Sequence, residues 1–110
     1  MKIKLKLTAD ELRFLENKSC VVMAMHINDL PKDKKSTYTI MIDVADKVMS
    51  KAKVLNRQLT SDKKKHDVSL KWHEAETLEL FLTGFQEVEI DPYKANMFRK
   101  IISQLNQKLA

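Results

Sequence analysis

Two short stretches of the chain alternate between polar and apolar residues with a period of two. In residues 2–7, lysine alternates with isoleucine or leucine, and in residues 67–72 polar residues alternate with valine, leucine and tryptophan. A period of two is typical of a strand that buries one face and exposes the other. The two stretches therefore predict a small antiparallel sheet whose apolar side chains face the core.

The first helix is predicted to begin at Ala9. Thr8 and Glu11 have the spacing of a capping box, in which the threonine hydroxyl accepts a helix amide and the glutamate reaches back. Apolar residues then recur at helical spacing as far as His26, and a second apolar flank predicts that the C-terminal half of this helix is deeply buried. Residues 29–37 contain a proline and several lysines, which predicts a loop.

The clearest helical pattern follows this loop. Its apolar positions fall on one narrow stripe, which consists of Met41, Val44, Ala45, Val48, Ala52, Leu55 and Leu59. Ser36 or Thr39 is the candidate N-cap of this helix. The pattern ends in a charged loop at residues 61–66.

Two further helices are predicted in the last third of the chain. The apolar residues of the first are Ala75, Leu78, Phe81 and Leu82. Gly84 then stands where a helix C-cap needs a left-handed residue, and Val88 and Ile90 alternate with acids, which predicts a short extended piece or strand. Asp91 and Pro92 predict the N-cap and first residue of the final helix. Its apolar residues are Phe98, Ile101, Ile102, Leu105 and Leu109.

These patterns predict a single α+β domain over residues 1–110. It is mostly helical, with about four α-helices and a small two-stranded antiparallel sheet, and an all-α helical bundle is the alternative fold. One glycine and two prolines are too few turn residues for an all-β sandwich or barrel, and they leave no glycine-rich phosphate loop. A content of 44% hydrophobic and 32% charged residues is typical of a globular chain.

Few residues have the chemistry of a catalytic site. Cys20 lies six positions from His26, which does not suit a thiolate–imidazole pair on one helix, so we expect a buried structural cysteine. His73 and Glu74 begin like a zinc-binding helix but lack its second histidine, and we expect an exposed helix start instead. His66 follows three lysines and is expected to be solvated. The sequence therefore predicts neither an enzyme nor a cofactor or metal site.

The cysteine count and the N-terminus bear on the compartment. A single cysteine forms no internal disulfide, which favours a reducing environment. The N-terminal residues alternate, whereas a secretory signal needs a continuous apolar stretch, and the charge-free stretch that follows is too short to span a bilayer. We therefore expect a cytoplasmic protein with no membrane partner, of a composition compatible with a bacterial origin.

Charge is polarised along the chain. The formal net charge is +5, but residues 32–71 hold eleven basic and five acidic residues, whereas residues 72–93 hold six acidic and no basic ones. We expect the acidic segment of one chain to meet the basic region of another. On this interpretation the chain is a small non-enzymatic interaction or accessory protein that forms a homo-oligomer or binds a protein partner.

The alternative is a nucleic-acid-binding protein without sequence specificity. Its phosphate contacts would come from the basic central region, namely Lys53, Arg57, Lys63, Lys64, Lys65 and Lys71, with Lys2, Lys4 and Lys6 on the outer face of the sheet. The sequence has only three arginines and no aromatic residues among these lysines. It therefore offers few candidates for reading bases or stacking on them.

Overall fold

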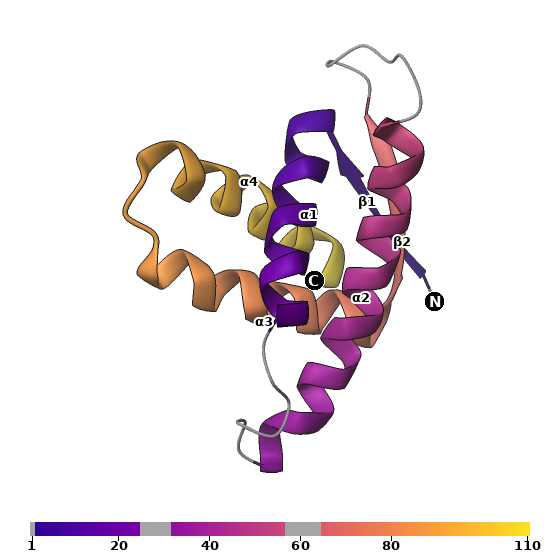
Figure 1. The fold of residues 1–110 in the computed structure, drawn as a ribbon, viewed down its shortest axis with the longest axis vertical. Helices are drawn as coiled ribbons and strands as arrows, with labels where there is room; N and C mark the ends of the chain where they lie inside the picture. Colours follow the sequence, from indigo (N-terminus) through magenta and orange to yellow (C-terminus); the bar gives the residue numbers. More distant parts are fainter. Residues whose placement is uncertain (1, 25–31, 57–64) are drawn as a thin grey trace.

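The computed structural model describes residues 2–24, 32–56 and 65–110, except for the side chains of residues 33, 34, 55 and 56. Its elements in chain order are β1 (Lys2–Leu7), α1 (Ala9–Ala24), α2 (Lys32–Asn56), β2 (His66–Lys71), α3 (Trp72–Val88) and α4 (Pro92–Leu109). The helices pack against a two-stranded sheet (Figure 1). The predicted mostly helical α+β class is confirmed, and the pairing of the strands excludes the all-α alternative.

The sheet is antiparallel, and its register places Leu5 opposite Val68. Apolar residues of both strands are buried and the residues between them are exposed, as the alternation predicted. Strand β2 begins and ends one residue earlier than predicted, because Trp72 already belongs to α3. The Lys71 amide donates a hydrogen bond to Glu74 Oε1 at 2.7 Å, which turns the chain from strand into helix at this point.

Helix α1 begins at Ala9, as predicted. Thr8 Oγ1 accepts the Glu11 amide at 3.2 Å and Glu11 Oε1 accepts the Thr8 amide at 2.9 Å, so both halves of the capping box are present. The predicted deep burial of the C-terminal half is wrong. Only one stripe of this half packs inward, so Val22 is fully buried while Val21 is 43% exposed.

Helix α2 begins at Lys32, inside the predicted loop of residues 29–37. No residue after the proline breaks a helix there, and lysine is a good helix former. Neither candidate N-cap has that role, because Ser36 and Thr39 lie within the helix. Thr39 Oγ1 instead donates back to the Lys35 carbonyl at 2.9 Å.

The apolar stripe of α2 is confirmed over its described part. Met41, Val44, Ala45, Val48 and Ala52 are all buried. The side chain of Leu55, the whole of Leu59 and the predicted helical residue His26 lie outside the described residues. The Tyr38 hydroxyl donates to the Val22 carbonyl at 2.8 Å, which ties the start of α2 to the end of α1.

Helix α3 passes through Gly84 and ends at Val88, so the predicted C-cap is wrong. Gly84 has no positive φ, and the helix continues because Phe85 just beyond it packs against the core. Glu89 and Asp91 are extended, but they pair with no strand among the described residues. Asp91 caps α4 as predicted, since its Oδ1 accepts the amide of the second residue of α4 at 3.0 Å.

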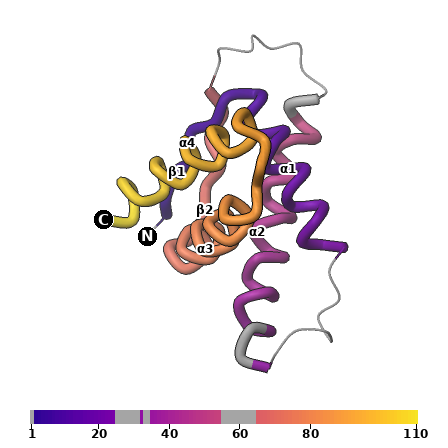
Figure 2. Tube along the Cα trace, turned by 90° about the vertical axis from the view of Figure 1, so that its left-hand side faces the viewer, coloured from indigo at the N-terminus to yellow at the C-terminus, as the bar shows by residue number. Residues whose placement is uncertain are grey.

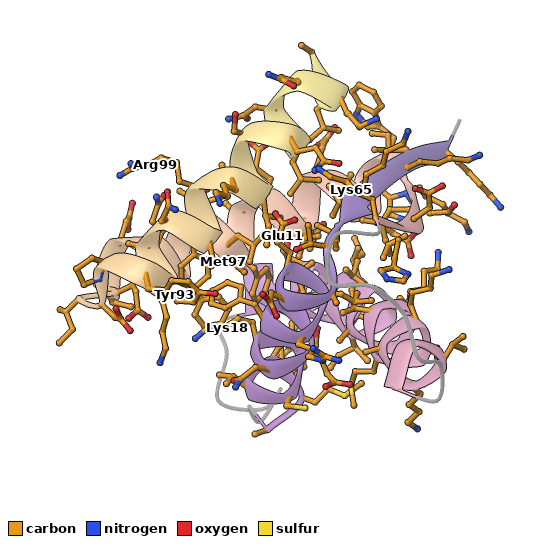
Figure 3. The ribbon with its side chains drawn as sticks, turned by 90° about the horizontal axis from the view of Figure 1, so that it is seen from above. Glu11, Lys18, Lys65, Tyr93, Met97 and Arg99 are labelled. Carbon is orange, nitrogen blue, oxygen red and sulfur yellow. The ribbon has the colours of Figure 1, made fainter. Side chains whose placement is uncertain are left out.

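The core lies between the sheet and the helices and includes Phe98, which is fully buried. The Phe98 ring meets Phe14 of α1 edge-on, with centroids 4.8 Å apart, and stacks on Phe85 of α3 at 6.3 Å. Lys18 Nζ lies 5.4 Å from the Phe98 centroid, so a cation covers this cluster from outside (Figure 3). The cluster therefore joins α1 to α3 and α4, two helices that lie side by side in Figure 2.

Candidate interaction surfaces

The structure describes half of the basic residues predicted to bind nucleic acid. Lys53, Lys65 and Lys71 are exposed, whereas Arg57, Lys63 and Lys64 lie outside the described residues. Lys65 precedes β2 and Lys71 ends it, which separates them by about 20 Å of extended chain. Lys53 is in the last turn of α2, at the end of the molecule where β2 begins (Figures 1 and 2). The described part of this predicted site is therefore spread along the molecule.

A second basic surface is more compact. Lys2, Lys4, Lys6 and Lys71 are the exposed lysines of the sheet and form what we call the lysine face. The register places Lys2 opposite Lys71 and Lys6 opposite Asp67. Four ammonium groups thus share the face with one carboxylate, and the facing lysines Lys2 and Lys71 repel each other. Such a surface attracts the anionic groups of a partner.

The two edges of the sheet differ. At the β1 edge, the Lys6 amide donates to Gln104 Oε1 at 2.6 Å and Gln104 Nε2 donates to the Lys6 carbonyl at 2.8 Å. The main chain of Lys6 therefore points away from β2, so Lys6 and Asp67 form a non-hydrogen-bonded pair. Alternation along β2 then directs the N–H and C=O groups of Asp67 and Ser69 to the other edge. Neither main chain has a partner there among the described residues.

A groove runs beside this open edge of β2, between the strand and helix α2. This α2–β2 groove has a volume of about 460 Å³ and is lined by Asp46, Lys47, Ser50, Lys51, Val54, Asp67, Val68 and Ser69. The groove is shallow and largely open to solvent, so it suits a segment laid along it rather than an enclosed small molecule. The groove was not predicted from the sequence. Val54, which is 49% exposed and lies off the buried stripe of α2, is a local signal for it.

Glu74 is buried, which corrects the expectation of an exposed helix start. Its Oε1 accepts hydrogen bonds from Lys47 Nζ at 2.6 Å and from the Lys71 amide at 2.7 Å. Burial alone would raise the pKa of Glu74, but these hydrogen bonds and the nearby positive charge outweigh burial and hold the pKa below its usual value. This ion pair joins α2 to the start of α3 and is structural.

The turn between α3 and α4 exposes several apolar side chains. We call residues 87–93 the hairpin tip. Val88, Ile90 and Tyr93 are 77%, 95% and 64% exposed. They are interleaved with Glu87, Glu89 and Asp91, none of which forms a salt bridge with a described residue. The tip lies at the opposite end of the molecule from the sheet (Figures 1 and 3).

The described residues form no cluster of three or more histidine, cysteine, aspartate or glutamate side chains that could hold a metal ion. Cys20 is a free, exposed thiol, which corrects the expectation of burial, because it lies on the outer side of α1. His66 is buried rather than solvated, because the alternation along β2 places its side chain on the inward-facing side of the sheet, opposite Leu7. The buried Nε2 of His66 has no hydrogen-bond partner among the described residues.

No helix within the described ranges is long and apolar enough to cross a membrane.

Comparison with protein-family profiles, with curated proteins and with solved structures gives no match to this chain. Its function is therefore inferred from its own surfaces.

Proposed function

We propose that the chain is a non-enzymatic interaction protein whose copies associate, with the hairpin tip of one copy against the lysine face of another. The observation that carries this proposal is the 95% exposure of Ile90. Together with Val88 and Tyr93 it forms an apolar group at a protruding turn, surrounded by carboxylates. Grouped apolar surface rimmed by charge is typical of sites that a protein partner covers.

The two surfaces complement each other in charge and in side-chain chemistry. The tip supplies the carboxylates of Glu87, Glu89 and Asp91, and the lysine face supplies ammonium groups. Each lysine also has an apolar four-carbon stem. The stems can cover Val88 and Ile90 while the charged ends reach the carboxylates. The apolar side chains and the carboxylates of the tip are then both in contact with a lysine.

The acidic segment is only partly neutralised within one copy. Among the described residues, Lys47–Glu74 is the salt bridge that joins this segment to the basic region. The carboxylates of the tip lie at the far end of the α3–α4 pair and remain available to another molecule (Figure 1).

The position of the two surfaces determines the kind of assembly. They lie at opposite ends of the molecule, so the contact is heterologous, and each copy can accept one neighbour and bind another (Figure 3). Heterologous contacts produce rings or open chains. We therefore expect a series of sizes that grows with concentration, rather than a single dimer.

Sedimentation velocity over a range of protein concentrations tests the proposal. Wild type should grow in mass with concentration at low salt and return to monomer at high salt, because the contact is charged. Ile90→Ser and Lys4→Glu should each weaken association, whereas Val21→Ser, which changes an exposed apolar residue of α1, should not. A monomer at every concentration, or an equal effect of Val21→Ser, contradicts the proposal.

The lysine face also favours a second candidate function, sequence-independent binding of nucleic acid. Fluorescence anisotropy with labelled duplex and single-stranded DNA tests it. Binding should weaken steeply as salt rises, and Lys4→Ala should reduce both affinity and the salt slope because one phosphate contact is lost. Lys108→Ala, in the last turn of α4, is the control. An absence of binding at low salt eliminates this candidate.

A further inference from the structure

We propose that the α2–β2 groove binds an extended segment of another protein, in which apolar and acidic residues alternate, and that this segment adds to the sheet as a third strand beside β2. The occupant is not a second copy of the chain, so this inference goes beyond the self-association proposed above and does not depend on it.

The open edge of β2 supplies the main-chain half of the site. The N–H and C=O groups of Asp67 and Ser69 point away from β1 and have no partner among the described residues. Only an extended backbone offers acceptors and donors at the spacing of a strand, as in other cases where a peptide adds to a sheet edge. At the β1 edge, Gln104 occupies the main chain of Lys6. The same alternation leaves the main chains of Lys2 and Lys4 open at the β1 edge, so it is the groove beside β2 that directs an added strand to β2.

The surroundings of the edge determine which side chains fit. An added strand places alternate side chains on the two faces of the sheet. On the inner side they meet the groove, where the half-exposed Val54 offers an apolar contact among polar and charged neighbours such as Asp46 and Lys51, so apolar residues fit beside Val54. On the outer side they lie beside Asp67, Ser69 and Lys71, next to the lysines of β1, so carboxylates fit at the Ser69 and Lys71 end of this edge.

The hairpin tip has the same alternation, but its main chain is already engaged. The Glu89 amide donates to the Gln86 carbonyl at 3.2 Å, and the Asp91 amide donates to Glu89 Oε1 at 3.1 Å. The Asp91 carbonyl accepts the Ala95 amide at 2.9 Å. A segment with a free backbone is therefore the better occupant, and we assign it to another protein.

The direct test is binding of a short labelled peptide in which valine alternates with glutamate, measured by fluorescence anisotropy on the wild-type protein. A peptide of equal length in which valine alternates with lysine is the control. We expect saturable binding of the valine–glutamate peptide and at least about tenfold weaker binding of the control. Equal binding of the two peptides, or no binding of either, overturns the proposal.

A second test removes the main-chain hydrogen bonds. Ser69→Pro deletes an N–H that points away from β1, so the β1–β2 ladder keeps its own bonds. We expect about tenfold weaker peptide binding for Ser69→Pro and unchanged binding for Ser69→Ala, which retains the N–H. Equal binding by all three proteins contradicts strand addition.

Peptides methylated on alternate amide nitrogens test the same point on the wild-type protein, independently of whether Ser69→Pro folds. Methylation of the amides that face β2 should abolish binding, and methylation of the other set should not. Equal effects of the two patterns overturn the inference. Peptide binding and self-association can be tested independently of each other. Ile90→Ser should leave peptide binding unchanged, and Ser69→Pro should leave the sedimentation behaviour unchanged.

Discussion

Glu74 Oε1 lies 2.6 Å from Lys47 Nζ and 2.7 Å from the Lys71 amide nitrogen, so one buried carboxylate oxygen joins three elements. Lys47 comes from the middle of α2, Lys71 ends β2, and Glu74 is in the first turn of α3. The carboxylate thus fixes the point where the sheet passes into the α3–α4 pair. Lys47 itself is 41% exposed, so water reaches the cation but scarcely the anion.

Removal of the cation should destabilise the fold. We expect Lys47→Met to lower the free energy of unfolding by about 1–3 kcal/mol, because a buried carboxylate loses a charge-assisted hydrogen bond. Urea denaturation measures the change. Lys51→Met, one turn further along α2 at a residue without a salt bridge in the described structure, should cost much less. Equal costs for the two variants would show that the pair contributes nothing specific.

The lowered pKa of Glu74 predicts a pH dependence of stability. A carboxyl group whose pKa is lower in the folded state stabilises the fold fully above its unfolded value, near 4.5, and loses this contribution as the pH falls through the folded pKa. The stability difference between wild type and Glu74→Gln should therefore narrow as the pH drops below 4.5. Denaturation series at several pH values measure it. Glu76→Gln, at an exposed position of the same helix, should show no comparable narrowing.

Gln104 should protect the edge of β1. We expect Gln104→Leu to lower stability by about 1–2 kcal/mol, because the main-chain groups of Lys6 lose both partners. Hydrogen exchange of the Lys6 amide should accelerate in this variant by more than the global stability change explains. Gln107→Leu alters an exposed glutamine of α4 and should leave that amide protected. Unchanged protection in Gln104→Leu would rule out the pairing.

Gly84 should be replaceable with a gain in stability. It lies inside α3 without a positive φ, and a Cβ at this position meets nothing within 4 Å. Gly84→Ala should therefore raise stability by about 0.5–1 kcal/mol, because alanine is the better helix former. Thermal unfolding measures it. Gly84→Asn distinguishes a position inside a helix from a left-handed C-cap, because asparagine is favoured over alanine only in the cap. Inside the helix, Gly84→Asn should be less stable than Gly84→Ala.

Features that depend on neighbouring residues in the sequence were predictable. The buried face of the sheet follows from the period of two at residues such as Leu5 and Val68. The starts of α1 and α4 follow from Thr8 and Asp91, whose capping partners lie two or three residues further on. In each case the structural cause lies within one turn of the chain.

Features that depend on distant partners were not predictable. His66 follows a run of lysines, and its burial is decided by its register opposite Leu7 rather than by its neighbours in sequence. The lysine and glutamate composition of α2 and α3 does not reveal which residues meet, so the Lys47–Glu74 pair could not be chosen from it. The open edge of β2, and hence the α2–β2 groove, appears only once both strands are paired.

The bond between Lys6 and Gln104 spans 98 positions of the chain, and this separation affects how the protein is made. During synthesis β1 leaves the ribosome before the other elements of this fold, β2 follows only after α1 and α2, and α4 comes after all of them. Both edges of β1 therefore stay unpaired until β2 has been synthesised. Lysines at every second position keep such a strand from pairing with other nascent chains. The outer edge of β1 at Lys6 is thus hydrogen-bonded only after α4 has been synthesised.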